Sequence, residues 1–198
     1  MADLEGRAEE HQVLRQVRAR HDDDTLVVYQ AYSPAIAEPA LRAGTFVSPF
    51  KRERMTWIKP SFNWMMYRCG WAEKPGQERV LAITITRAGF DWALEHSCLA
   101  DEASKERKHA SPVRVQWDPE RDVALQRLEH RAIQVGLGGE AVGRYVDEWI
   151  TGIEDVTPLA REVAGLVRAG DLAAAARLVP EERPLELSAA AAAAVGVS

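Results

Sequence analysis

The sequence lacks the short motifs that mark the common nucleotide, zinc and hydrolase sites. It contains no GxGxxG, no GxxxxGK[ST], no HExxH and no paired CxxC, which excludes the standard dinucleotide, P-loop and zinc signatures. A GxSxG nucleophile elbow is also absent. The sequence therefore carries none of the standard nucleotide, zinc or hydrolase signatures.

Cysteine is scarce as well, with Cys69 and Cys98 as the two examples. Their spacing does not suit a metal site and no secretory signal is evident, so we expect reduced thiols in a cytoplasmic protein and no bound metal. No apolar run approaches the roughly 20 residues that a helix needs to cross a bilayer. The sequence therefore predicts a protein without a membrane segment.

An excess of positive charge is missing too, since the net charge is −5 at pH 7. This argues against a protein that coats nucleic acid by bulk electrostatics, although a local basic patch can still bind phosphate. Hydrophobic residues make up 46% and charged residues 28% of the 198 residues, an ordinary globular balance. We predict one domain over residues 1–187 and a disordered or frayed alanine-rich tail over residues 188–198.

Hydrophobic patterns predict an α+β fold. Strands are expected at residues 25–32, 77–87, 113–117 and 130–137, the third closed by a turn at Asp118-Pro119. Helices are expected from a charged N-terminal one to about residue 20, then at residues 34–43, 61–70, 88–96 and 157–170, followed by a short one that ends before Pro180. A strong apolar stripe from Val142 to Ile153 predicts a further amphipathic helix.

The most unusual segment runs from Phe50 to Trp71 and mixes tryptophans with cations. Aromatic planes can stack on a base or a nicotinamide ring, and guanidinium groups can bind phosphate, so the mixture suits a nucleotide-like ligand. The alternative is that the indoles fill the core and the cations form a solvated rim. The candidate binding residues, with one tyrosine from the first strand, are Tyr32, Arg54, Trp57, Lys59, Ser61, Trp64 and Arg68.

Two glutamines interrupt otherwise apolar strands. Gln30 lies near the end of the first strand and Gln134 lies within the last one. A buried amide is costly without hydrogen-bond partners, so each of them needs partners in the fold or a ligand. Both interpretations stay open at this point.

Four strings carry a resemblance to a known family: VYQAY from Val28, MTWIKPSFNWMMYR from Met55, GQERVLAITITR from Gly76 and RAIQVGL from Arg131. The chain resembles domain-of-unknown-function family 4291 over roughly residues 19–187. That resemblance covers nearly the whole chain and does not by itself imply an activity.

A more distant similarity is to the ADP-ribosyltransferase superfamily, because VYQAY followed by AEPALRAGTF is laid out like the superfamily's first strand, helix and glycine. The resemblance implies a small split, mainly antiparallel sheet with flanking helices, to which this chain adds a helical C-terminal appendage, and it implies NAD as the cofactor. Gln30 then stands where a His or Arg is usual. Gln134 stands for the late-strand Glu or Gln that positions the ribose, and Gln30 and Gln134 are the candidate catalytic residues.

Three functions follow as expectations. The first is NAD or nucleotide binding, with or without transfer of ADP-ribose to an unknown acceptor. The second is a non-catalytic module for single-stranded nucleic acid, in which the tryptophans stack on bases. The third is a protein-interaction module that uses the helix around Trp149 or the alanine-rich tail.

Overall fold

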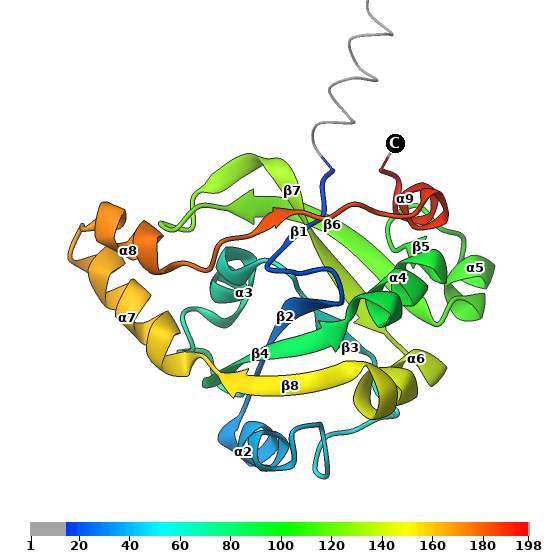
Figure 1. Ribbon diagram of the computed structural model, residues 1–198, viewed down its shortest axis with the longest axis horizontal. Helices are drawn as coiled ribbons and strands as arrows, with labels where there is room; N and C mark the ends of the chain where they lie inside the picture. Colours follow the sequence, from blue (N-terminus) through cyan, green and yellow to red (C-terminus); the bar gives the residue numbers. More distant parts are fainter. Residues whose placement is uncertain (1–14, 198) are drawn as a thin grey trace, which may run out of the picture.

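The computed structural model describes residues 15–197 and shows an α+β fold (Figure 1). Three sheets carry the strands: β2-β4-β8, β3-β7-β6-β5 and the short pair β1-β9. Most of the N-terminal helix expected before residue 20 lies outside the described residues, and within them Arg18–Ala19 forms strand β1. The fold class expected from the sequence is confirmed.

The first sheet contains the most regular part of the chain. Strand β2 (Thr25–Tyr32) pairs antiparallel along its whole length with β4 (Arg79–Thr86), and β4 pairs antiparallel with β8 (Ile150–Asp155). In β4 the side chains of Leu81, Ile83 and Ile85 are completely buried, as the period-two pattern predicts. These residues share the larger core with Leu26 and Val28 of β2.

The second sheet is formed by β3 (Thr56–Ile58), β7 (Arg127–Leu137), β6 (Val113–Arg121) and β5 (Ser97–Leu99). The turn expected at Asp118-Pro119 is wrong, because β6 continues through both residues and pairs Asp118 with Ala132. The pairing becomes irregular between Pro119 and Arg121, where a proline without an N–H is tolerated. As a result, Asp118 lies on the sheet and not in a loop.

The two larger sheets meet at one backbone bridge. The N–H of Tyr29 donates to the carbonyl of Lys59 at 2.7 Å, and the N–H of Lys59 donates back to the carbonyl of Tyr29 at 3.2 Å. The bridge fixes the end of β2 beside β3. It therefore brings the two polar regions of the sequence, around Gln30 and around Trp57, into one place.

Helices α2 (Pro34–Ala43) and α3 (Phe62–Cys69) begin and end as the sequence predicts. Gly44 and Gly70 end them with φ of 71° and 59°, a left-handed conformation that glycine adopts without strain. The side chain of Ser61 caps α3 by accepting a hydrogen bond from the N–H of Trp64 at 3.0 Å. Helix α4 (Arg87–Glu95) also has its expected place, and the segment between β5 and β6, for which no helix was expected, contains α5 (Lys105–Ala110).

The amphipathic helix expected from Val142 to Ile153 ends earlier than the apolar pattern that predicted it. Helix α6 (Glu140–Arg144) passes into one π-helical turn, η1 (Tyr145–Trp149), and the chain then becomes strand β8. Ile153 pairs with Ile83 of β4, so an apolar residue at helical spacing serves a sheet instead. Trp149 is buried in the core, which leaves no exposed stripe for a partner there.

The C-terminal part is largely helical, as expected. Helices α7 (Thr157–Arg168) and α8 (Leu172–Leu178) lie at one end of the molecule, and strand β9 (Arg183–Pro184) leads to α9 (Ala189–Val195) at the other (Figure 1). The frayed tail expected over residues 188–198 is wrong for α9, because Ala191 and Val195 are fully buried in the larger core. Ser188 caps this helix, and small alanines allow it to pack closely.

Within residues 15–197, no helix combines the length and the apolar character needed to cross a membrane.

Candidate functional site

The segment from Phe50 to Trp71 supplies walls to two adjoining cavities. It comprises the end of the loop between α2 and β3, all of β3 and helix α3. Both cavities are lined by Tyr32, Met55 and Thr56, so they adjoin at these residues. We call them the aromatic cavity and the basic cavity.

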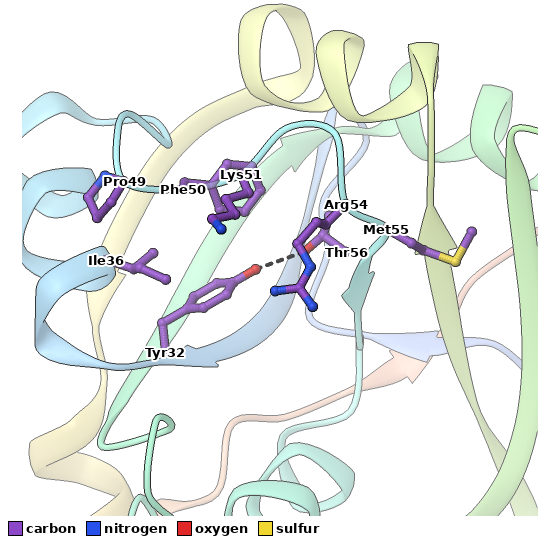
Figure 2. A pocket seen from close by; sticks show the side chains of 8 residues that line it. All are labelled: Tyr32, Ile36, Pro49, Phe50, Lys51, Arg54, Met55 and Thr56. Carbon is purple, nitrogen blue, oxygen red and sulfur yellow. Dashed lines mark hydrogen bonds between the residues drawn. The ribbon is translucent and has the colours of Figure 1, made fainter.

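The aromatic cavity has a volume of about 310 Å³. It is lined by Tyr32, Ile36, Pro49, Phe50, Lys51, Arg54, Met55 and Thr56. In Figure 2 the hydroxyl of Tyr32 points to Thr56, while Met55 points away from the other residues. Rings thus lie beside two exposed cations, Lys51 and Arg54.

Aromatic contacts and an ion pair hold the loop that forms this cavity. The ring of Phe50 stacks on Phe46 with centroids 4.5 Å apart, and Tyr32 meets Phe50 edge to face at 6.0 Å. Arg52 binds Asp147 of η1 with two hydrogen bonds of 2.7 and 2.8 Å. The rings are therefore fixed before any ligand arrives.

The basic cavity has a volume of about 220 Å³ and is open to solvent. Its lining residues come from β2, β3, α3 and the loop before β4, and they are Gln30, Ala31, Tyr32, Met55, Thr56, Trp57, Lys59, Met65, Arg68 and Gln77. Trp57 lies directly over Gly136 of β7, where an added Cβ would come within 2.9 Å of the indole. Only glycine at that position lets the ring lie flat on the sheet.

Lys59 is the most unusual charged residue of the basic cavity. It is 7% exposed, and its Nζ donates a long hydrogen bond of 3.3 Å to the carbonyl of Trp57. Burial, together with repulsion from Arg68, lowers its pKa to about 8, while Asp118 acts in the opposite direction. The cavity thus contains two cations that favour an anionic ligand.

Gln30 is 3% exposed and completely engaged in hydrogen bonds at the junction of the two cavities. Its Nε2 lies 2.6 Å from Thr56 Oγ1, 2.9 Å from the Tyr32 hydroxyl and 3.2 Å from the carbonyl of Trp57, all of which can accept. Its Oε1 accepts from the hydroxyl of Tyr145 at 2.8 Å. Tyr32 and Thr56 also bond to each other at 2.7 Å. These hydrogen bonds of Gln30 therefore hold the side chains of Tyr32 and Thr56 in place.

Gln134, the second predicted catalytic residue, is buried on β7 and donates a hydrogen bond to Asp118 Oδ2 of β6. It lines neither cavity. Burial raises the pKa of Asp118, against the opposing effects of Gln134 and Arg68. Sequence reasoning missed Asp118, because an Asp-Pro pair is typical of a turn.

Two other predicted residues, Ser61 and Trp64, also line neither cavity. Ser61 caps α3 and donates to Glu120 Oε1 at 2.9 Å. Trp64 is 3% exposed and stacks on Tyr67 with centroids 5.1 Å apart, with Arg121 nearby. The structure therefore places six predicted residues in the cavity linings: Gln30, Tyr32, Arg54, Trp57, Lys59 and Arg68. The other three, Ser61, Trp64 and Gln134, line neither cavity.

A third hollow, of about 460 Å³, lies elsewhere and is lined by Arg20, His21, Pro180, Glu181 and Arg183. It is larger than either cavity but contains none of the predicted site residues. Within the described part of the chain, no group of three or more His, Cys, Asp or Glu residues could hold a metal ion. Both cysteines are buried thiols.

The fold and the cavities define an α+β domain with a split sheet and hollows where its two larger sheets meet. The chain belongs to the family described as Domain of unknown function (DUF4291), which matches residues 16–185. No curated protein shows a significant match to the chain.

Proposed function

We propose that the two adjoining cavities form one site for NAD or a related nucleotide. The observation that carries this proposal is their adjacency: a hollow with fixed rings and exposed cations shares three residues with a hollow that contains two cations. Binding sites for small ligands have volumes of roughly 300–1,000 Å³. At about 310 and 220 Å³ each cavity alone is small for a dinucleotide, so the proposed ligand needs both.

Each cavity supplies a different part of the recognition. Phe50 and Tyr32 offer aromatic surface to a base or a nicotinamide ring. Arg54, at the aromatic cavity, and Lys59 and Arg68, in the basic cavity, are the groups for the phosphates. An anion placed there would also offset the repulsion between Lys59 and Arg68.

The finer proposal, from the resemblance to ADP-ribosyltransferases, is that bound NAD is cleaved and its ADP-ribose is transferred. Cleavage releases nicotinamide, and positive charge develops on the ribose, which a carboxylate stabilises better than an amide does. Asp118, hydrogen-bonded to Gln134, is the carboxylate that acts electrostatically on Lys59. Asp118 lines neither cavity, so it is our candidate for an acidic group that acts on the ribose at a distance, which Gln30 and Gln134 cannot supply.

Isothermal titration with NAD and ADP-ribose tests the binding proposal. We expect saturable binding that Arg54→Gln and Arg68→Gln each weaken at least about tenfold, because a hydrogen bond to a charged group contributes about 1.5–3 kcal/mol. Arg42→Gln is the matched control, since Arg42 is exposed on α2 and lines neither cavity. Absence of heat at millimolar ligand would overturn the binding proposal. Binding without nicotinamide release by chromatography would overturn the transfer alone.

The alternative of single-stranded nucleic-acid binding receives less support from the geometry. Trp64 and Trp71 are buried, at 3% and 9% exposed, so they present little surface on which bases could stack. Such binding must weaken steeply as salt rises, because phosphate contacts release counterions. Titration of a fluorescent oligonucleotide at two salt concentrations distinguishes nucleic-acid binding from nucleotide binding.

A cytoplasmic location stays a prediction.

A further inference from the structure

Lys59 is held in place more firmly than a surface lysine. Its backbone forms both hydrogen bonds of the bridge to Tyr29, at 2.7 and 3.2 Å, so its Cα cannot shift without separating the two sheets. The residue is only 7% exposed, although lysine is seldom buried without an acidic partner. The position of its amine is thus set by the fold.

Few groups in the described structure stabilise the charged form of the Lys59 amine. None of the ion pairs formed by residues 15–197 includes Lys59. Among the same residues, its Nζ has three N–H donors but donates one long hydrogen bond, of 3.3 Å, to the carbonyl of Trp57. Burial, together with repulsion from Arg68, favours the neutral amine, while Asp118 favours the ammonium.

A buried amine whose pKa is lowered is neutral in a larger fraction of molecules than an ordinary lysine, and its neutral form, at the wall of an open cavity, is a nucleophile. We propose that Lys59 is the reactive amine of a site that binds a small aldehyde or ketone carrying a carboxylate or phosphate. The Nζ lone pair attacks the carbonyl carbon and forms a C–N bond. The carbinolamine then loses its oxygen as water to give the imine. One molecule of water is released, and no oxidant or reductant is consumed.

Arg68 gives this site its preference for an anion. It lines the same cavity from the last turn of α3, where its guanidinium can bind a carboxylate or phosphate in bidentate fashion. A cavity of about 220 Å³ suits a molecule of a few non-hydrogen atoms. The proposal shares Lys59 and Arg68 with the proposed nucleotide site but does not rest on nucleotide binding, because it needs neither Phe50 nor Arg54.

Reductive trapping tests the proposal on the unmodified chain. The protein is incubated at pH 7 with glyoxylate and cyanoborohydride, and modified lysines are quantified by peptide mass spectrometry over time. An amine with a pKa of about 8 has roughly 10% in the neutral form at pH 7, against about 0.03% for an ordinary lysine near 10.5. We expect Lys59 to be modified at least tenfold faster than the exposed Lys51 and Lys74, the advantage being reduced by limited access.

A second reagent distinguishes the reactivity of the Lys59 amine from the binding of an anion by Arg68. Propionaldehyde is uncharged, so Arg68→Gln should lower the labelling of Lys59 by glyoxylate at least fivefold more than its labelling by propionaldehyde. Labelling of Lys59 no faster than that of Lys51 and Lys74 would overturn the proposal and leave a structural lysine. An equal effect of Arg68→Gln on both reagents would overturn the preference for anionic carbonyl compounds.

Discussion

The aromatic and the basic cavity share a wall but differ in how their polar groups are satisfied. The hydroxyls that the aromatic cavity shares with the basic one, those of Tyr32 and Thr56, are bonded to each other and to Gln30. At the basic side, Lys59 has one long hydrogen bond and Arg68 is exposed at the cavity edge. The satisfied groups fix the shape of the site, whereas the cations with few partners select what enters it.

The largest effect is expected from removing the amide that supports both cavities. Gln30→Leu leaves the buried hydroxyl of Tyr145 without its acceptor and removes the partner of Thr56 and Tyr32. Unsatisfied buried groups cost about 1–3 kcal/mol each, so we expect a loss of about 2–4 kcal/mol in the free energy of unfolding. Urea denaturation measures it.

Gln77→Leu is the matched control, because Gln77 also lines the basic cavity but is only partly buried. Its effect should stay within about 0.5 kcal/mol. Equal losses for the two variants would mean that the network around Gln30 does not support the fold.

A smaller effect is expected from disturbing the wall of the basic cavity alone. In Gly136→Ala the new Cβ meets the indole of Trp57 at 2.9 Å, so the ring must move. Overpacking of this kind costs about 1–3 kcal/mol, which thermal unfolding can measure. The control is Gly152→Ala on β8, where the nearest atom lies 4.0 Å away. A loss as large in the control would show that a Cβ on a strand, and not Trp57, is responsible.

The last prediction concerns the pH dependence of stability at the start of α3, the helix that carries Arg68 of the basic cavity. Glu182 accepts from the N–H of Phe62 at the start of α3 at 2.6 Å, and burial together with repulsion from Glu120 raises its pKa to about 8. A carboxyl group with a raised pKa in the folded state stabilises the fold at low pH. That contribution is lost as pH rises from about 4.5 to about 8.

Glu182→Gln should therefore have a higher free energy of unfolding than the wild type at pH 8, and should lose less stability between pH 5 and pH 8. Glu181→Gln, at the exposed neighbouring position, should behave like the wild type. Parallel pH profiles of wild type and Glu182→Gln would contradict the raised pKa.

Local patterns predicted the elements that frame the site. The strand at Thr25–Tyr32 follows from its β-branched and aromatic residues, and the helix starts at Pro34 and Ser61 follow from capping residues, which are properties of a few adjacent side chains. The same patterns failed at Ile153, where helical spacing continued into a strand that pairs with β4. Pairing with a distant strand outweighed the local period there.

The candidate site was only partly predictable for a similar reason. The composition of Phe50 to Trp71 indicated aromatic and basic side chains, and six of the nine predicted residues line the cavities. Trp64 lines neither cavity, because its place on α3 turns it toward Tyr67 and Arg121 of β6. Asp118 became relevant only through its register opposite β7, which the sequence around it does not specify.

The most direct measurement is a crystal structure of the chain with NAD at saturating concentration. The account predicts a ring of the ligand against Phe50 and Tyr32, with its phosphates within hydrogen-bond distance of Arg54, Lys59 or Arg68. Density for NAD at the hollow around Arg20 and Arg183, or empty cavities despite saturation, would contradict it.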